Sequence, residues 1–217
     1  MQQQMPRRDF LRLVPAAAAG GVAATGVAGT RVFGADCSDG DGLTAAELEG
    51  RRQVAAVCDL LREHFMDGRG VPLGWLPAKI GIRETRHVRC LHSLTADELL
   101  VGKRFPDAVV NGTYHIDVHS ASGAGVKFRE LNEGVSFYQV PYASLVPRGA
   151  KNLLIAGRSI DADEQAFGAV RVMVNCNQTG QAAGAAAWLA LDSGTDVASI
   201  NTRKLRTALS NQGAVML

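Results

Sequence analysis

The amino-acid sequence predicts a mixed α/β (or α+β) chain, on the basis of three observations. Residues 151–191 hold a short apolar run, a polar break and then a helix of small residues. Residues 70–147 hold short β-prone runs that glycine and proline interrupt. An apolar content of 47% and a charged content of 20% are typical of a globular protein. The chain of 217 residues is long enough for one ordinary domain or two small ones.

Composition also excludes several classes of function. The net charge is only +2, so we expect no nucleic-acid partner, which would need a strongly basic surface. The four cysteines are widely spread and form no C-x-x-C pair. They therefore indicate neither a zinc site nor a dense disulfide framework, and we expect no metal.

Residues 1–35 predict an export signal of the twin-arginine type. Arg7 and Arg8 precede an uncharged segment, residues 13–29, that alanine and glycine dominate. The segment is too short and too weakly apolar for a membrane span, so we expect none after signal removal. Cleavage after Ala24, Ala28 or Ala35 stays open, as does a chance arginine pair before an ordinary helix. The predicted location is periplasmic or extracellular.

Residues 36–69 predict a loop followed by a helix. Thr44 and Glu47 have the spacing of a capping box, and apolar residues then recur on one helical face. Residues 40–45 also fit G-x-G-x-x-A, but no apolar strand precedes them, so they fail as a dinucleotide fingerprint. A calcium loop fails too, because Cys37 would occupy the first ligand position.

Residues 70–147 predict a β-rich lobe, with strands at 126–128, 135–140 and 143–146. Thr95 and Glu98 form a second capping box that opens a short helix.

Residues 148–217 predict a strand at 151–157 and a helix at about 178–191. The helix would begin near Gly180, where its unpaired N–H groups and the positive end of its dipole would lie. An amphipathic helix is predicted at 201–211, closed near Gly213. A plain Ala-rich helix that packs on a strand is the alternative interpretation.

Three motifs in order, LLIAGRSI, AFGAVRVM and TGQAAGAAA, resemble the C-terminal flavin-binding segment of FAD-dependent oxidoreductases of the glutathione-reductase-like superfamily. GIRETR, GKRFPDAVVNGTYHIDVH and FYQVPYASLVP are similar to other motifs of the same family, which is also called xanthan lyase-like. The resemblance runs from about Gly42 to Leu217. It implies part of a Rossmann-like FAD-binding domain with a β-rich substrate lobe, and FAD as the cofactor.

The resemblance also implies which residues contact the cofactor. The strand–Gly–Arg element would pass the ribityl and pyrophosphate part of FAD, and the Gly-Gln-Ala-Ala-Gly helix would face the isoalloxazine ring. The expected cofactor-binding residues are Gly157, Arg158, Ser159, Phe167, Arg171, Gly180, Gln181 and Ala182.

The candidate catalytic residues are Arg83, Arg86 and His119. The arginines, with Glu84 beside them, would hold an anionic or hydroxyl-rich substrate, a small molecule or a carbohydrate-like one. His119 would share one side of a strand with His115 and Asp117, where a histidine can act as a general acid or base. A metal site there lacks a fourth ligand. For each residue, an ordinary Arg–Glu pair or a surface histidine is the alternative.

One departure from the family bears on activity. Family members carry a strand–G-x-G-x-x-G–helix that grips the FAD pyrophosphate, and no competent copy occurs in these 217 residues. We therefore expect a truncated form of an exported FAD-dependent oxidoreductase, with little capacity to retain FAD. The alternative is a non-catalytic remnant or an exported binding domain of the same fold.

Overall fold

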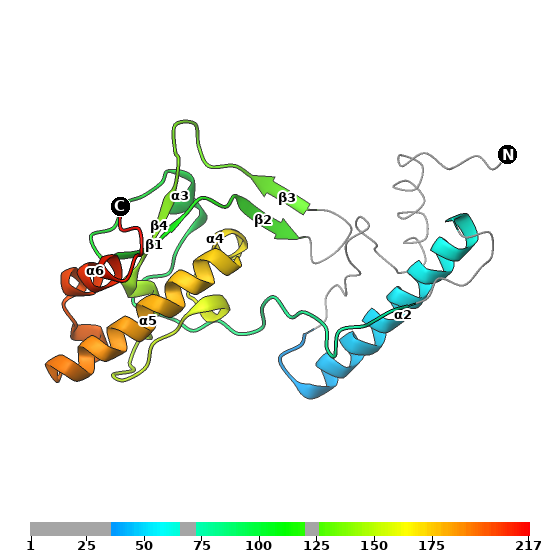
Figure 1. Cartoon of the computed structure of the whole chain (residues 1–217), viewed down its shortest axis with the longest axis horizontal. Helices are drawn as coiled ribbons and strands as arrows, with labels where there is room; N and C mark the ends of the chain where they lie inside the picture. Colours follow the sequence, from blue (N-terminus) through cyan, green and yellow to red (C-terminus); the bar gives the residue numbers. More distant parts are fainter. Residues whose placement is uncertain (1–35, 66–72, 120–125) are drawn as a thin grey trace. The chain divides into compact units, whose positions relative to one another are not determined.

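The computed structural model describes residues 36–65, 73–119 and 126–217 (Figure 1). The predicted export signal lies outside these residues. The chain forms two compact units, which are described separately. The first contains Met1–Thr85 and His119–Gly125, and the second contains Arg86–Val118 and Val126–Leu217. The four-segment division expected from the sequence stays a prediction.

A long helix, α2 (Gly40–Phe65), dominates the described part of the first unit. It begins earlier than the sequence predicts, because the Asp39 carboxylate accepts a hydrogen bond from the Gly42 N–H at 2.8 Å. Thr44 lies inside the helix, where its hydroxyl donates to the Gly40 carbonyl at 2.7 Å. The predicted capping box at Thr44 is therefore wrong.

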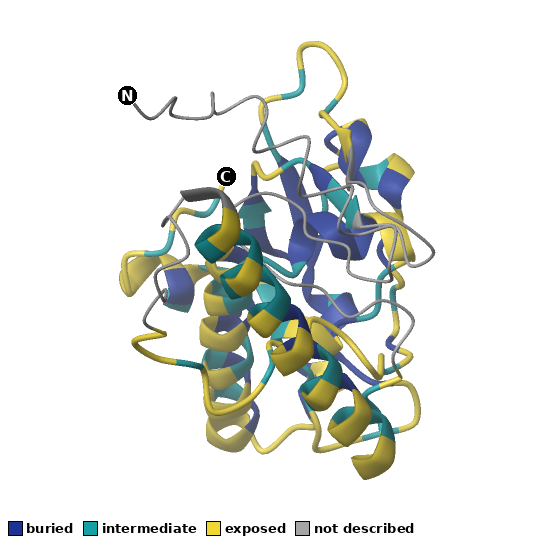
Figure 2. Ribbon diagram, turned by 90° about the vertical axis from the view of Figure 1, so that its right-hand side faces the viewer, coloured by how far each residue is buried: buried dark blue, intermediate teal, exposed yellow. Residues whose placement is uncertain are grey.

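The second unit is built on an antiparallel strand pair, β1 (Ala108–Gly112) and β4 (Tyr138–Pro141). Helix α5 (Met173–Ser193) packs against this sheet, and Figure 2 shows buried residues gathered over the strands and exposed ones along the outer helix faces. The inward face of α5 carries Ala182, Ala186 and Ala190, all buried. Such small side chains let a helix axis approach a sheet closely.

Gln178 of α5 also bonds the edge of strand β1 directly. Its Oε1 accepts from the Asn111 N–H at 3.0 Å, and its Nε2 donates to the Asn111 carbonyl at 3.2 Å. One side-chain amide thus takes the place of a neighbouring strand at this residue.

Two short helices meet beside this sheet. Helix α3 (Ala96–Leu100) starts with the predicted capping box of Thr95 and Glu98, which is confirmed. Helix α4 (Glu164–Val170) starts at Asp163. Asp163 Oδ1 accepts from the Ala166 N–H at 2.7 Å, and its Oδ2 accepts from the Ala96 N–H at 2.8 Å. One carboxylate therefore holds the starts of both helices.

A second sheet pairs β2 (Ile116–His119) with β3 (Val126–Arg129). The described part of the unit also contains the 3₁₀ turns η2 (Tyr142–Leu145), η3 (Gly157–Ser159) and η4 (Val197–Ser199). The final helix, α6 (Thr202–Asn211), confirms the predicted terminal helix, and Asn201 caps it. Both short sheets and the helices give a mixed α/β chain, as predicted.

Three predicted elements differ from the structure. The strand predicted at 151–157 does not form. The Ile155 N–H donates to the Leu145 carbonyl at 2.8 Å, and the Lys151 carbonyl accepts from the Val197 N–H at 3.2 Å, but these two bonds go to different segments and build no strand ladder. Residues 143–146 lie mostly in η2 rather than in a strand. Helix α5 begins at Met173 and not near Gly180, which lies in mid-helix. Helix α5 starts at Met173 because Val172, with an extended backbone, separates the end of α4 from the start of α5.

None of the described helices combines the length and the apolar character that crossing a membrane requires.

Candidate functional site

The turn η3 lies against the first turns of helix α5 and forms the centre of the candidate site. The Gly157 N–H donates to Thr179 Oγ1 at 3.0 Å, and that hydroxyl donates to the Cys176 carbonyl at 2.8 Å. Gly157 has a φ of +66°, in the left-handed region that favours glycine. A Cβ added there would have Cys176 Sγ as its nearest protein atom, at 3.9 Å. The hydrogen bond to Thr179 thus fixes the backbone at Gly157, and there is space beside its Cα for another group.

The start of α5 carries exposed apolar side chains. Met173 is 82% exposed and Val174 is 67% exposed. The capping residue, Val172, provides no side-chain hydrogen bond to the first-turn N–H groups, which carry the positive end of the helix dipole. An apolar surface beside hydrogen-bond donors suits a flat ring with an electron-rich edge.

Arg171, the residue before Val172, contacts strand β2 and does not face solvent. Its Nη2 donates to the Asp117 carbonyl at 3.1 Å and lies 3.5 Å from the Asp117 carboxylate. Both side chains are largely buried, at 14% and 13% exposure. At Gly168 an added Cβ would lie 2.6 Å from the Asp117 carbonyl oxygen, so α4 and β2 touch backbone to backbone. Arg171 thereby positions the α4–α5 junction against β2.

Cys176 lies beneath η3, near the cation of Arg158. Burial raises the pKa of the Cys176 thiol, and the Arg158 charge lowers it to a smaller extent. The thiol stays protonated at neutral pH and donates to the Arg171 carbonyl at 3.3 Å. Arg158 and Ser159 are exposed, so η3 presents one positive charge beside the start of α5.

The other predicted cofactor residues lie apart from this cluster or face inward. Phe167 is buried and its ring meets the edge of His87 at 4.5 Å. Ala182 is fully buried against the core. Gly180 and Gln181 are exposed in mid-helix, where Gln181 bonds Gln212 at 3.3 Å. The reason for choosing these three α5 residues, a helix start at Gly180, does not hold, because the helix begins seven residues earlier.

The candidate catalytic residues are divided between the two units. Arg83 belongs to the first unit and Arg86 to the second, and both are exposed in irregular backbone. His119 ends β2, and its side chain lies outside the described parts. The proposed role of these three residues stays a prediction.

His115 occupies an aromatic cluster that the sequence did not indicate. Its ring stacks on Tyr114 at 4.3 Å and meets the edge of Phe128 at 4.9 Å. Its Nε2 is buried and has no hydrogen-bond partner among the described residues. Asp117, which was expected on the same side as His115, lies 3.5 Å from Arg171 Nη2. Among the residues described, no group of three or more His, Cys, Asp or Glu side chains could hold a metal ion.

Sequence reasoning missed Met173, Val174 and Thr179 as site residues. Thr179 carried a usable signal, because a hydroxyl within a helix of alanines and glycines has a polar partner when buried. Met173 and Val174 carried none, since apolar residues beside Val172 read as core.

The candidate site therefore combines an open glycine turn, an apolar helix start without a side-chain cap, and an arginine beside them, within a mixed α/β protein. The comparison with known families identifies the chain. The model of the family described as FAD dependent oxidoreductase matches residues 2–209, so the chain belongs to that family. No curated protein and no solved structure matches the chain.

Proposed function

We propose that this protein is an exported FAD-dependent oxidoreductase whose flavin ring binds at the start of helix α5. In this proposal residues 148–217 supply the flavin-facing part of a Rossmann-like FAD-binding domain, and residues 70–147 supply the substrate lobe. The observation that carries the proposal is the Gly157–Thr179 hydrogen bond of 3.0 Å, which holds the open glycine turn beside the helix start.

The residues at this end fit a flavin. The first-turn N–H groups of α5 would donate to the oxygen-rich edge of the ring, and Met173 and Val174 would cover its apolar face. Arg158 would add a positive charge. Gly157, without a side chain, would let the cofactor pass close to the backbone. A bound flavin would accept a hydride from the substrate, and these residues would orient it.

The phosphate end of the cofactor is the weak part of the site. No strand–G-x-G-x-x-G–helix occurs in the 217 residues, and such loops supply much of the affinity for a pyrophosphate. A charge-assisted hydrogen bond contributes about 1.5–3 kcal/mol, so lacking two or three of them weakens binding by orders of magnitude. We infer that this chain by itself retains little FAD.

The flavin absorbance of the purified protein tests this proposal. We expect little visible absorbance before or after adding FAD and desalting, and recovery of binding when a relative's dinucleotide-binding segment is grafted in. A yellow protein with near-stoichiometric FAD would show that the chain has another phosphate grip. Failure of the grafted protein to bind FAD would instead favour the second candidate, a non-catalytic binding domain of the same fold.

A pair of glycine variants in the grafted protein tests the location. Gly157→Ala should weaken FAD binding, because the new Cβ would occupy the space proposed for the cofactor. Gly134→Ala is the matched control, since Gly134 also has a positive φ, +79°, with no protein atom within 4 Å of an added Cβ. Equal FAD dissociation constants for both variants, measured by flavin fluorescence, would place the ring elsewhere.

A further inference from the structure

Two arginines lie opposite each other beside the isolated antiparallel bridge between Cys90 and Pro147. The Arg148 N–H donates to the Arg89 carbonyl at 2.9 Å, so these two residues form the next pair along the bridge. Side chains of such a pair leave the same face, with Cβ atoms about 4.5–5.5 Å apart. Both arginines are exposed. The two guanidinium groups therefore start from neighbouring positions on one surface of the second unit.

A neutral group holds the Arg148 side chain. Its Nε donates to the Cys90 carbonyl at 2.6 Å, which orients the guanidinium without neutralising its charge. Asp161 lies beside the same residue, but its carboxylate accepts from the Cys90 N–H at 2.7 Å. Within the described residues, neither Arg89 nor Arg148 forms an ion pair with a carboxylate. The N–H donors of Arg89 and the Nη donors of Arg148 therefore remain for a ligand.

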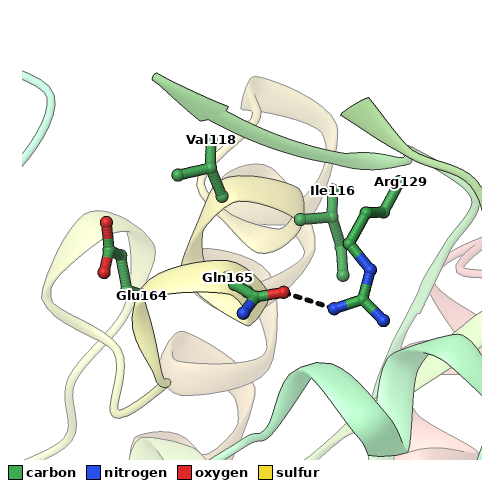
Figure 3. A pocket seen from close by; sticks show the side chains of 5 residues that line it. All are labelled: Ile116, Val118, Arg129, Glu164 and Gln165. Carbon is green, nitrogen blue, oxygen red and sulfur yellow. Dashed lines mark hydrogen bonds between the residues drawn. The ribbon is translucent and has the colours of Figure 1, made fainter. Parts of the chain in front are cut away.

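The pairing of two like charges lowers the stability of the free protein, because such charges repel when they lie directly opposite on paired segments. Arg129 provides a contrast, since the recess that it lines between the β2–β3 sheet and α4 also contains Glu164 (Figure 3). There the guanidinium donates to Gln165 Oε1, and one charge of each sign is present. Arg89 and Arg148 have no such counter-charge in ion-pair contact in the described part of the chain, so a ligand would supply it.

We propose that Arg89 and Arg148 together bind the dianion of a phosphate monoester. Its three terminal oxygens can accept from both guanidinium groups, and its two negative charges match the two cations. A carboxylate or a phosphate diester carries one charge and would leave the pair with a net positive charge. Leu91, which is 51% exposed, lies two residues from Arg89 on the same side of the segment and would contact the carbon substituent of the ester. Neither arginine belongs to the flavin site proposed above.

A matched pair of esters tests this proposal on the full chain, with binding measured by phosphorus NMR titration at constant ionic strength. Methyl phosphate carries two negative charges at about pH 8, and dimethyl phosphate carries one. We expect saturable binding of methyl phosphate, and binding of dimethyl phosphate that is roughly fivefold or more weaker. Equal binding of the two esters, or no saturable binding of methyl phosphate, would overturn the proposal.

A vesicle experiment distinguishes the two sources of a phosphate monoester. Once methyl phosphate binds, sedimentation of the protein with phosphatidylcholine vesicles that contain phosphatidic acid would assign the monoester to a lipid headgroup. No sedimentation with these vesicles would assign it to a soluble compound. Both results keep the same two arginines as the site.

Variants locate the binding at this pair. Arg89→Gln and Arg148→Gln should each weaken methyl phosphate binding roughly fivefold or more. Arg129→Gln is the control, because Arg129 is exposed and no second arginine lines its recess. Unchanged affinity in Arg89→Gln, or an equal loss in Arg129→Gln, would contradict the assignment.

Thermal denaturation separates a binding role of Arg89 from a structural one. Without phosphate, Arg89→Gln should raise the unfolding midpoint by roughly 1–3 °C, because the repulsion between like charges is removed. Methyl phosphate should raise the midpoint of the wild type more than that of the variant. A midpoint below the wild-type value without phosphate would show that Arg89 stabilises the fold, and this would count against the proposal. None of these results depends on whether the chain binds flavin.

Discussion

At Gly112 the fold leaves no room for a side chain. An added Cβ would lie 2.4 Å from Cε2 and Cζ of Tyr138. Tyr138 is fully buried, its hydroxyl donates to the Ala169 carbonyl at 3.2 Å, and Asn175 donates to that hydroxyl at 2.9 Å. The ring is therefore held at both its face and its hydroxyl, and it has no free direction in which to move.

We predict that Gly112→Ala lowers the free energy of unfolding by about 1–3 kcal/mol, as overpacking does in a close-packed core. The control is Gly184→Ala, on the exposed side of α5, where an added Cβ meets nothing within 4 Å. That change should raise stability by up to about 1 kcal/mol, because alanine favours a helix more than glycine. Urea denaturation measures both, and equal effects would contradict the packing argument.

Glu98 makes the free energy of unfolding depend on pH in the acid range. Burial raises the pKa of Glu98, but hydrogen bonds from Lys103, His92 and the Thr95 N–H lower it, and the net shift is downward. Because the pKa is lower in the folded state, the resulting stabilisation is present above the ordinary value of 4.5. It is lost as the pH falls through the folded value.

We predict that Glu98→Gln lowers the free energy of unfolding at pH 7 by about 1–2 kcal/mol, because charge-assisted hydrogen bonds are lost. The difference from wild type should shrink as the pH falls below 4.5, the ordinary value for this carboxyl. Urea denaturation at a series of pH values measures it. If the free energies of unfolding of the two proteins differ by the same amount across this pH range, the Glu98 carboxylate is not the source of the pH-dependent stabilisation.

At the scale of elements, Asp163 joins the starts of α3 and α4, so its removal affects two helices together. We predict that Asp163→Ala lowers the free energy of unfolding by about 2–4 kcal/mol, combining a lost N-cap with an unpaired buried N–H at Ala96. Asn201→Ala is the control, because Asn201 caps α6 alone. It should cost about 0.5–2 kcal/mol. Thermal denaturation that ranks Asn201→Ala as the more damaging change would refute the shared cap.

At the scale of the whole molecule, the family match begins at residue 2 and so includes the predicted export signal. We predict that changing Arg7 and Arg8 together to lysine leaves the protein uncleaved in the cytoplasm, because twin-arginine export distinguishes the two cations. Arg12→Lys is the conservative control nearby. Fractionation followed by immunoblotting measures the location. Delivery of the double-lysine variant at the wild-type level would argue against this type of signal.

The sequence by itself determined the elements whose signals are local. The capping box at Thr95, the amphipathic pattern of the terminal helix and the run of small residues in α5 all act within a few turns. Backbone hydrogen bonds and side-chain caps over such short spans do not need the rest of the chain. Gly157 and Arg158 were expected to bind the cofactor because of the motif resemblance. The turn that they form lies against α5, and their role in binding stays a prediction.

The tertiary structure alone decided what depends on distant partners. Residues 152–156 are apolar like a strand, yet strand formation requires a neighbouring backbone, and only Ile155 finds one. Ala182 is buried in the core, and Arg171 contacts Asp117 of strand β2. Both placements depend on how α5 and α4 pack against strands that are distant in sequence. Helix α5 also begins at Met173 and not near Gly180 as predicted, directly after the extended residue Val172 that separates it from α4. Strand pairing and burial depend on contacts between residues that are far apart in sequence, so the local sequence pattern cannot predict them.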